Sequence, residues 1–148
     1  MSNKPDLNYY SLVVVQLEQI CSNSGEVLGH GTGFFCSWKN QKYLVTNHHV
    51  VSGYKPGTKE LIHSSAAIPG ALKASFQGGQ RIAYTEIKPF ELKVQQPLFD
   101  SKGEPVWLEH PEHGNSCDVV AIPVDYDNQP GMCEGAEICA IDLSLIHI

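Results

Sequence analysis

Residues 31–53 read GTGFFCSWKNQKYLVTNHHVVSG, and two extended segments are visible within them. The first is the apolar GFFCSW, and the second, Tyr43–Thr46, is rich in β-branched and aromatic residues. The short polar connection Lys39–Gln41 between them predicts a β-hairpin. Gly31 and Gly33 are expected to be structural, because a glycine allows another part of the chain to approach a strand closely.

The end of this stretch, NHHVVSG, predicts a single helical turn after the hairpin. Thr46 or Asn47 can cap its beginning, and the Ser-Gly pair that follows the valines is typical of its end. His48 and His49 are therefore expected where a strand becomes a helix.

The rest of the chain predicts further strands and no long helix. Tyr9–Gln19 is the expected first strand, with alternation at Val15 and Leu17. Later strand-like pieces are Glu60–His63, Ala71–Phe76, Arg81–Ile87, Phe90–Val94, Pro105–Leu108 and Val119–Val124. The residues expected to separate the middle pieces are Pro69, Gly70, Gly78, Gly79 and Pro89. Many short strands between turn residues predict an all-β barrel or sandwich.

The composition predicts a folded domain and argues against nucleic acid and membrane as partners. A chain of 148 residues with 42% hydrophobic and 18% charged residues predicts one folded domain. Its net charge is -6 and its 10 basic residues are scattered, so nucleic acid is not an expected partner. No apolar run approaches the ~20 residues of a membrane-spanning helix, so no membrane partner is expected either.

The beginning of the chain and its cysteines predict a cytoplasmic location. The first 20 residues lack the long apolar run of a signal peptide. The five cysteines, Cys21, Cys36, Cys117, Cys133 and Cys139, show no repeated spacing that would frame disulfides or a zinc site. We expect most of them to be reduced thiols.

One histidine and one aspartate suggest hydrolytic chemistry. A serine peptidase needs a histidine to take the proton from its nucleophile, and a carboxylate to fix the tautomer of that histidine. His49 lies at the strand-to-helix corner, and Asp118 opens the apolar run VVAIPV. A histidine that precedes the aspartate matches the chymotrypsin order and predicts that a serine comes last.

At these residues the sequence resembles the trypsin-like peptidases, particularly their bacterial, HtrA-like branch. GTGFF and YLVTNHHVV are similar to the second and third strands of that family and to the corner that carries its catalytic histidine. DVVAI is similar to the strand that begins with the catalytic aspartate, and EGAEICAID to the segment that leads into a second barrel. The resemblance implies that His49 is the general base and that Asp118 orients it.

The resemblance also implies a fold, a reaction and a partner. The fold would be an antiparallel six-stranded β-barrel, the first barrel of a two-barrel serine endopeptidase that cleaves protein or peptide substrates through an acyl-enzyme. No cofactor and no metal are expected. Val50 stands where animal trypsins carry a disulfide-bonded cysteine, so that disulfide is not expected here.

No GDSGG-like motif occurs in the sequence, and we expect the nucleophilic serine beyond Asp142. The chain as given is therefore expected to be inactive and, because an apolar face would lack its partner barrel, poorly soluble. LSLIHI, residues 143–148, resembles a translated sequencing adapter, which leaves residues 1–142 as the peptidase part.

Several alternative readings remain open. A one-residue slip in the match would make His48 the base, and Asp118 could instead cap a turn before an edge strand. Cys133 as a nucleophile follows Asp118 too closely to leave room for a second barrel. Asp125 and Asp127 are expected to be loop residues.

Two rival functions come from other classes. The first is a catalytically dead peptidase fold that binds proteins. The second is a metal-binding barrel that uses His48 and His49 together with His110, His113 and Cys117 as ligands. Without a fitting fourth ligand in the sequence, a solvated loop is the expected structure around His110 and His113.

Overall fold

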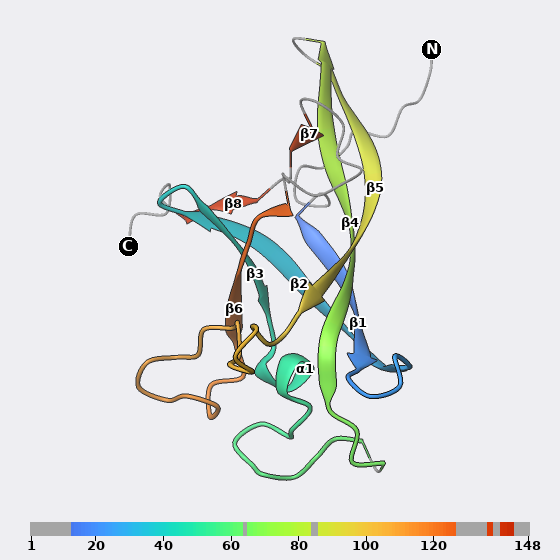
Figure 1. The fold of residues 1–148 in the computed structure, drawn as a ribbon. Coiled ribbons are helices and arrows are strands. Elements are labelled where there is room, and N and C mark those ends of the chain that lie inside the picture. The colour runs from blue at the N-terminus through green and yellow to red at the C-terminus, as the bar shows by residue number, and fades with distance from the viewer. Residues whose placement is uncertain (1–12, 64, 84–85, 127–135, 138–139, 144–148) are drawn as a thin grey trace.

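A computed structural model describes residues 13–63, 65–83, 86–126, 136–137 and 140–143 of the chain (Figure 1). Its elements are β1 (Val14–Cys21), β2 (Val27–Trp38), β3 (Gln41–Thr46), α1 (His48–Ser52), β4 (Pro69–Ala83), β5 (Glu86–Pro97), β6 (Val120–Val124), β7 (Ala136–Glu137) and β8 (Ile141–Asp142). The all-β class expected from the sequence is confirmed. The part of the predicted first strand before residue 13 lies outside the described residues, as do Asp127, Cys133 and Cys139.

The strands form one sheet that is almost entirely antiparallel. Its order is β5-β4-β1-β2-β3-β6, while the two-residue strands β7 and β8 pair with β4 and β2. The β8 pairing, with Ile141 opposite Cys36, is parallel. The sheet places β3 and β6 side by side, with Thr46 opposite Val120. This pairing brings the start of α1, which follows β3, next to the start of β6.

The hairpin predicted from residues 31–53 is confirmed. Strands β2 and β3 pair from Phe34 opposite Val45 to Trp38 opposite Gln41. Lys39 and Asn40 connect them with φ angles of 49° and 64°. Positive φ at both turn residues gives the twist that matches two neighbouring strands, which is why so short a connection suffices.

The middle of the chain differs from the prediction of several short strands. Strands β4 and β5 form one long hairpin that reaches well beyond the other strands (Figure 1). Arg81–Ile87, predicted as one strand, instead comprises the end of β4 and the start of β5. Gly78, predicted to end a strand, lies inside β4 opposite Phe90, whose ring covers the glycine where a side chain would otherwise be. An aromatic ring across a glycine keeps such a strand regular.

Two other predicted strands are only isolated bridges. Within Glu60–His63, Leu61 pairs with Tyr54, and within Pro105–Leu108 the two end residues form single bridges. One of these bridges joins Leu108 to Ala121 of β6, through hydrogen bonds of 2.8 and 3.2 Å in both directions.

The expected closed six-stranded barrel is not what the structure forms. Within the described residues, the outer strands β5 and β6 do not pair, so the sheet remains open. The chain after β5 runs between them instead: Leu98 donates to the Gly70 carbonyl, Val106 donates to Leu98, and Leu108 pairs with Ala121. Residues 98–108 therefore lie between β5 and β6 as a loop with few backbone hydrogen bonds. In a closed barrel, continuous strand pairing would be needed at this place.

The core lies on the concave side of the curled sheet. Phe35 of β2 makes edge-to-face contacts with Phe76 and Tyr126, at ring-centroid distances of 4.9 and 5.9 Å. The Tyr126 hydroxyl donates to Gln96 at 2.7 Å, and burial raises the pKa of this tyrosine. The other buried members are Val15, Leu17, Leu44, Val50, Val51, Leu72, Ala74, Val94, Leu98, Val120, Ile122 and Val124.

None of the helices in the described part is long and apolar enough to cross a bilayer.

Candidate active site

The helical turn α1 holds the two adjacent histidines. It has five residues, begins at His48 and ends at Ser52, with Gly53 at a φ of 77° after it. These bounds confirm the predicted turn. Asn47 occupies the N-cap position, but its side-chain amide donates to the Asp118 carbonyl at 2.9 Å instead of capping the helix. So short a helix is not stable alone, and its position must come from tertiary contacts.

Contacts from β1 and β2 fix the side of α1 that faces the core. Val50 and Val51 are buried, and the buried Gln19 of β1 donates to the Val50 carbonyl at 2.8 Å. A Cβ at Gly31 would lie 2.9 Å from a Val50 methyl group, so only glycine leaves room for α1 at this point of β2. The structural role expected for Gly31 is therefore confirmed.

His49 and Asp118 are brought together by the sheet. The His49 Nδ1 atom lies 2.7 Å from Asp118 Oδ2, and the His49 backbone N–H donates to Asp118 Oδ1 at 2.9 Å. Asp118 is thus bound to both the side chain and the backbone of one residue of α1. The second of these bonds satisfies an amide at the start of the helix, the role that a capping side chain usually has.

This geometry defines the protonation of the His49 ring. A carboxylate beside Nδ1 accepts a hydrogen bond, so Nδ1 carries the proton in the neutral ring and Nε2 has the free electron pair. Nε2 has no hydrogen-bond partner within the described part of the chain, and the His49 side chain is 37% exposed. The ring can therefore accept a proton at Nε2 from a group that approaches from outside.

His48 has a different environment and a different carboxylate. Its ring is 6% exposed, and its Nε2 lies 2.8 Å from Oε1 of Glu109. The same Glu109 oxygen accepts from the Trp107 indole at 3.2 Å, and the Trp107 ring packs edge-to-face on His48. The hydrogen bond from His48 is the main reason that the pKa of Glu109 lies below its ordinary value. Asp118 thus pairs with His49, whereas the alternative base His48 is turned away from it.

The loop with His110, His113 and Cys117 is held by turns. The His110 Nδ1 atom accepts from the backbone N–H of Glu112 and of His113, at 3.1 Å each, and the two rings lie 4.7 Å apart. Among the described residues, no group of three or more histidine, cysteine, aspartate or glutamate side chains is arranged to hold a metal ion.

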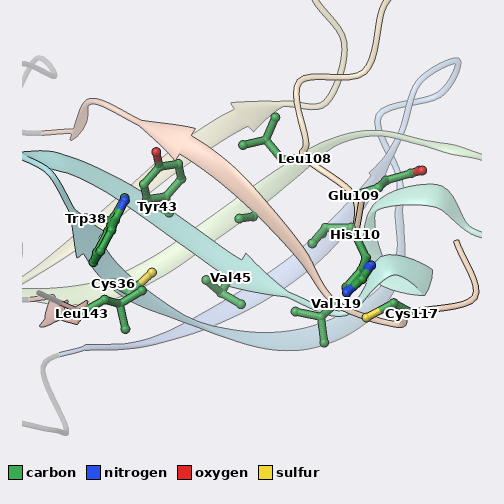
Figure 2. A pocket seen from close by; sticks show the side chains of 12 residues that line it. Cys36, Trp38, Tyr43, Val45, Leu108, Glu109, His110, Cys117, Val119 and Leu143 are labelled. Carbon is green, nitrogen blue, oxygen red and sulfur yellow. The ribbon is translucent and has the colours of Figure 1, made fainter. Parts of the chain in front are cut away.

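An apolar pocket of about 420 Å³ lies on the outer face of the sheet, beside this loop (Figure 2). Strands β2, β3 and β6 form its floor and the loop before β6 forms its rim. Its lining residues are Cys36, Trp38, Tyr43, Val45, Leu108, Glu109, His110, Cys117, Val119, Val120, Ala121 and Leu143. Burial raises the pKa of the Cys36 thiol. The described cysteines Cys21, Cys36 and Cys117 are free thiols.

Sequence reasoning found His49 and Asp118 but missed Glu109 and Gln19. Both missed residues act through tertiary contacts, Glu109 on His48 and Gln19 on the Val50 carbonyl in the middle of α1. A glutamate in a loop and a glutamine in a strand are usually solvated, so nothing in their local sequence distinguishes them.

Comparison with known proteins found no match to this chain among protein-family models, curated proteins or solved structures.

Proposed function

We propose that this chain is the histidine- and aspartate-bearing part of a serine endopeptidase, with His49 as general base and Asp118 as the group that orients it. The observation that carries the proposal is the 2.7 Å contact between His49 Nδ1 and Asp118 Oδ2. It leaves Nε2 of the neutral ring unprotonated, on a side chain that is 37% exposed, and this is the state in which imidazole takes a proton from a hydroxyl nucleophile.

In the proposed reaction, a serine beyond residue 142 of the intact protein attacks the peptide carbonyl. His49 takes the serine proton at Nε2 and then gives it to the leaving amine, which leaves an acyl-enzyme that water hydrolyses. Asp118 stabilises the cationic ring that exists between these two steps. The substrate class is protein or peptide. The reaction needs no reactant besides the serine, the imidazole, the substrate and water.

The outer face of the sheet supports the proposal that a second domain completes the enzyme. Large apolar side chains are exposed along it, and they come from neighbouring strands and the loop at the pocket rim: Phe34, Trp38, Leu108 and Val119. Contiguous apolar surface of this kind marks an interaction site in soluble proteins. A second domain of the same chain, on the side where β8 ends beside β2, would cover it.

The direct test is to read the source DNA past the codon for Asp142 and to express the longer reading frame. An organophosphorus reagent that labels activated serines is expected to modify the longer protein, and His49→Ala is expected to abolish the labelling. A frame that continues with another residue in the nucleophile position, or labelling that persists in His49→Ala, would contradict the peptidase. The catalytically dead, protein-binding fold would then explain the apolar face.

A pair of matched substitutions tests the apolar face. Val119 and Val27 are both half-exposed, at 50% and 49%, but only Val119 lies in the pocket on the outer face. We expect the 148-residue chain to self-associate through this face. Val119→Lys should shift it toward the monomer in sedimentation experiments, because a charge cannot be buried in an apolar contact without cost, whereas Val27→Lys should change little. A wild-type chain that sediments as a monomer would contradict this expectation.

A further inference from the structure

Two consecutive histidines in α1 are each paired with their own carboxylate. His49 pairs with Asp118 through Nδ1, and His48 pairs with Glu109 through Nε2. The neutral rings are therefore expected in opposite tautomers, with the proton on Nδ1 in His49 and on Nε2 in His48. The proposed catalysis uses the His49–Asp118 pair, and it gives no role to the His48–Glu109 pair.

Both carboxylates come from the segment that joins β5 to β6. Asp118 lies two residues before β6, and Glu109 follows Leu108, whose backbone pairs with Ala121 of β6. Glu109 is thus held against β6 by its neighbour and against the Trp107 indole by its own carboxylate. Oε1 of Glu109 binds His48, the first residue of α1, and so connects the loop to the helix.

The first turn of α1 needs such a connection. Its N-cap side chain bonds to Asp118 instead of to the helix, and at five residues the helix has little stability of its own. Gln19 binds the middle of α1, at the Val50 carbonyl. At the beginning of α1, His48 and His49 bind Glu109 and Asp118, and these contacts add to the bond from Asn47.

We propose that the His48–Glu109 pair is a positioning device that holds the start of α1 so that the His49 ring keeps its Nδ1–H directed at Asp118. His48 and Glu109 do not touch the reacting groups; Glu109 acts through His48, and His48 acts through the backbone that joins it to His49. The inference rests on the proposed function, because the orientation of His49 matters only if His49 is the base.

The physical basis is the cost of leaving a buried ring nitrogen unpaired. The His48 ring is almost fully buried, and Glu109 is the one partner of its Nε2–H among the described residues. The Glu109 side chain is 42% exposed, so without it the ring can regain a partner by moving toward the water on that side. We expect this movement to shift the backbone of the adjacent His49, and a shift of about 1 Å is enough to disrupt catalytic geometry.

The test is histidine side-chain NMR on the 148-residue chain, which reports the tautomer and the protected Nδ1 proton of each ring. In the wild type, we expect a slowly exchanging Nδ1 proton on His49 that is absent in Asp118→Asn. In Glu109→Ala this proton signal should be lost to exchange with water, although Asp118 is intact. Glu109→Gln, which keeps an oxygen acceptor for His48 and Trp107, should restore it.

Glu112→Ala is the matched control, because Glu112 belongs to the same loop and its side chain is largely exposed. It should leave the His49 signal unchanged. If Glu109→Ala does not fold, Glu109→Asp replaces it: the shorter side chain keeps the charge but cannot reach His48, and it should also lose the signal.

The outcomes separate the two proposals. A wild-type His49 ring without a protected Nδ1 proton would contradict the peptidase itself. A protected proton that disappears in Asp118→Asn but persists in folded Glu109→Ala and Glu109→Asp would overturn the positioning role and leave the His49–Asp118 pair intact.

Discussion

If the proposed peptidase activity is present in the longer protein, Asp118→Asn is expected to lower its kcat by about ten-thousandfold, the size of effect known for this change in serine peptidases. The asparagine oxygen can still accept from the His49 backbone N–H, so α1 should stay in place. Its NH₂ group, however, would then face Nδ1 of His49 and donate to it. The ring would then carry its proton on Nε2, and this nitrogen could no longer accept the serine proton.

Steady-state peptide hydrolysis by the longer protein measures this effect. His49→Ala should be at least as damaging, and the double variant should be little worse than His49→Ala alone, because the two residues act as a unit. Glu112→Gln, a change of an exposed acid in the same loop, serves as the control and should keep full activity. An Asp118→Asn variant that retains activity within about tenfold of the wild type would contradict the assigned role.

Phe35→Ala is expected to reduce the free energy of unfolding by about 3–5 kcal/mol, the usual cost of removing a buried aromatic ring. Phe35 has no exposed surface and packs against Phe76 of β4 and against Tyr126, which follows β6, so alanine leaves a cavity between these elements. Chemical denaturation followed by circular dichroism measures the change.

The neighbouring residue provides the control for this prediction. Phe34 is 40% exposed on the outer face, and Phe34→Ala should cost about 1 kcal/mol or less. The difference follows from the alternation of a strand, which sends adjacent side chains to opposite faces. Equal losses from the two variants would mean that β2 does not have the register described here.

The alternation of strands and the chemistry of turns made much of the fold readable from sequence. The Lys39–Asn40 turn and the strand on each side of it depend on contacts between near neighbours, and Gly53, at a φ of 77°, marks the residue after the end of α1. The β4–β5 hairpin was not readable in this way. A glycine inside a strand usually weakens it, and here the ring of Phe90 on the paired strand packs over Gly78.

The openness of the sheet was decided at long range. Whether β5 meets β6 depends on how residues 98–108 pack between them, and the hydrogen bonds of Leu98 and Leu108 reach to β4 and β6. Such partners lie far away in the chain, so local propensity carries no information about them. The family resemblance implied a closed barrel, and the described residues form an open sheet instead.

The residue types and their local settings can be read from the sequence: a histidine at a strand-to-helix corner, an aspartate before a buried strand, and Gly31 at the point of β2 that lies against α1. Tertiary structure alone decided which carboxylate each histidine meets. The β3–β6 pairing brings Asp118 to His49, and the Leu108 bridge to β6 brings Glu109 to His48. The reason is physical: hydrogen bonds of about 3 Å between residues far apart in the chain depend on the packing of the whole sheet, which no short segment encodes.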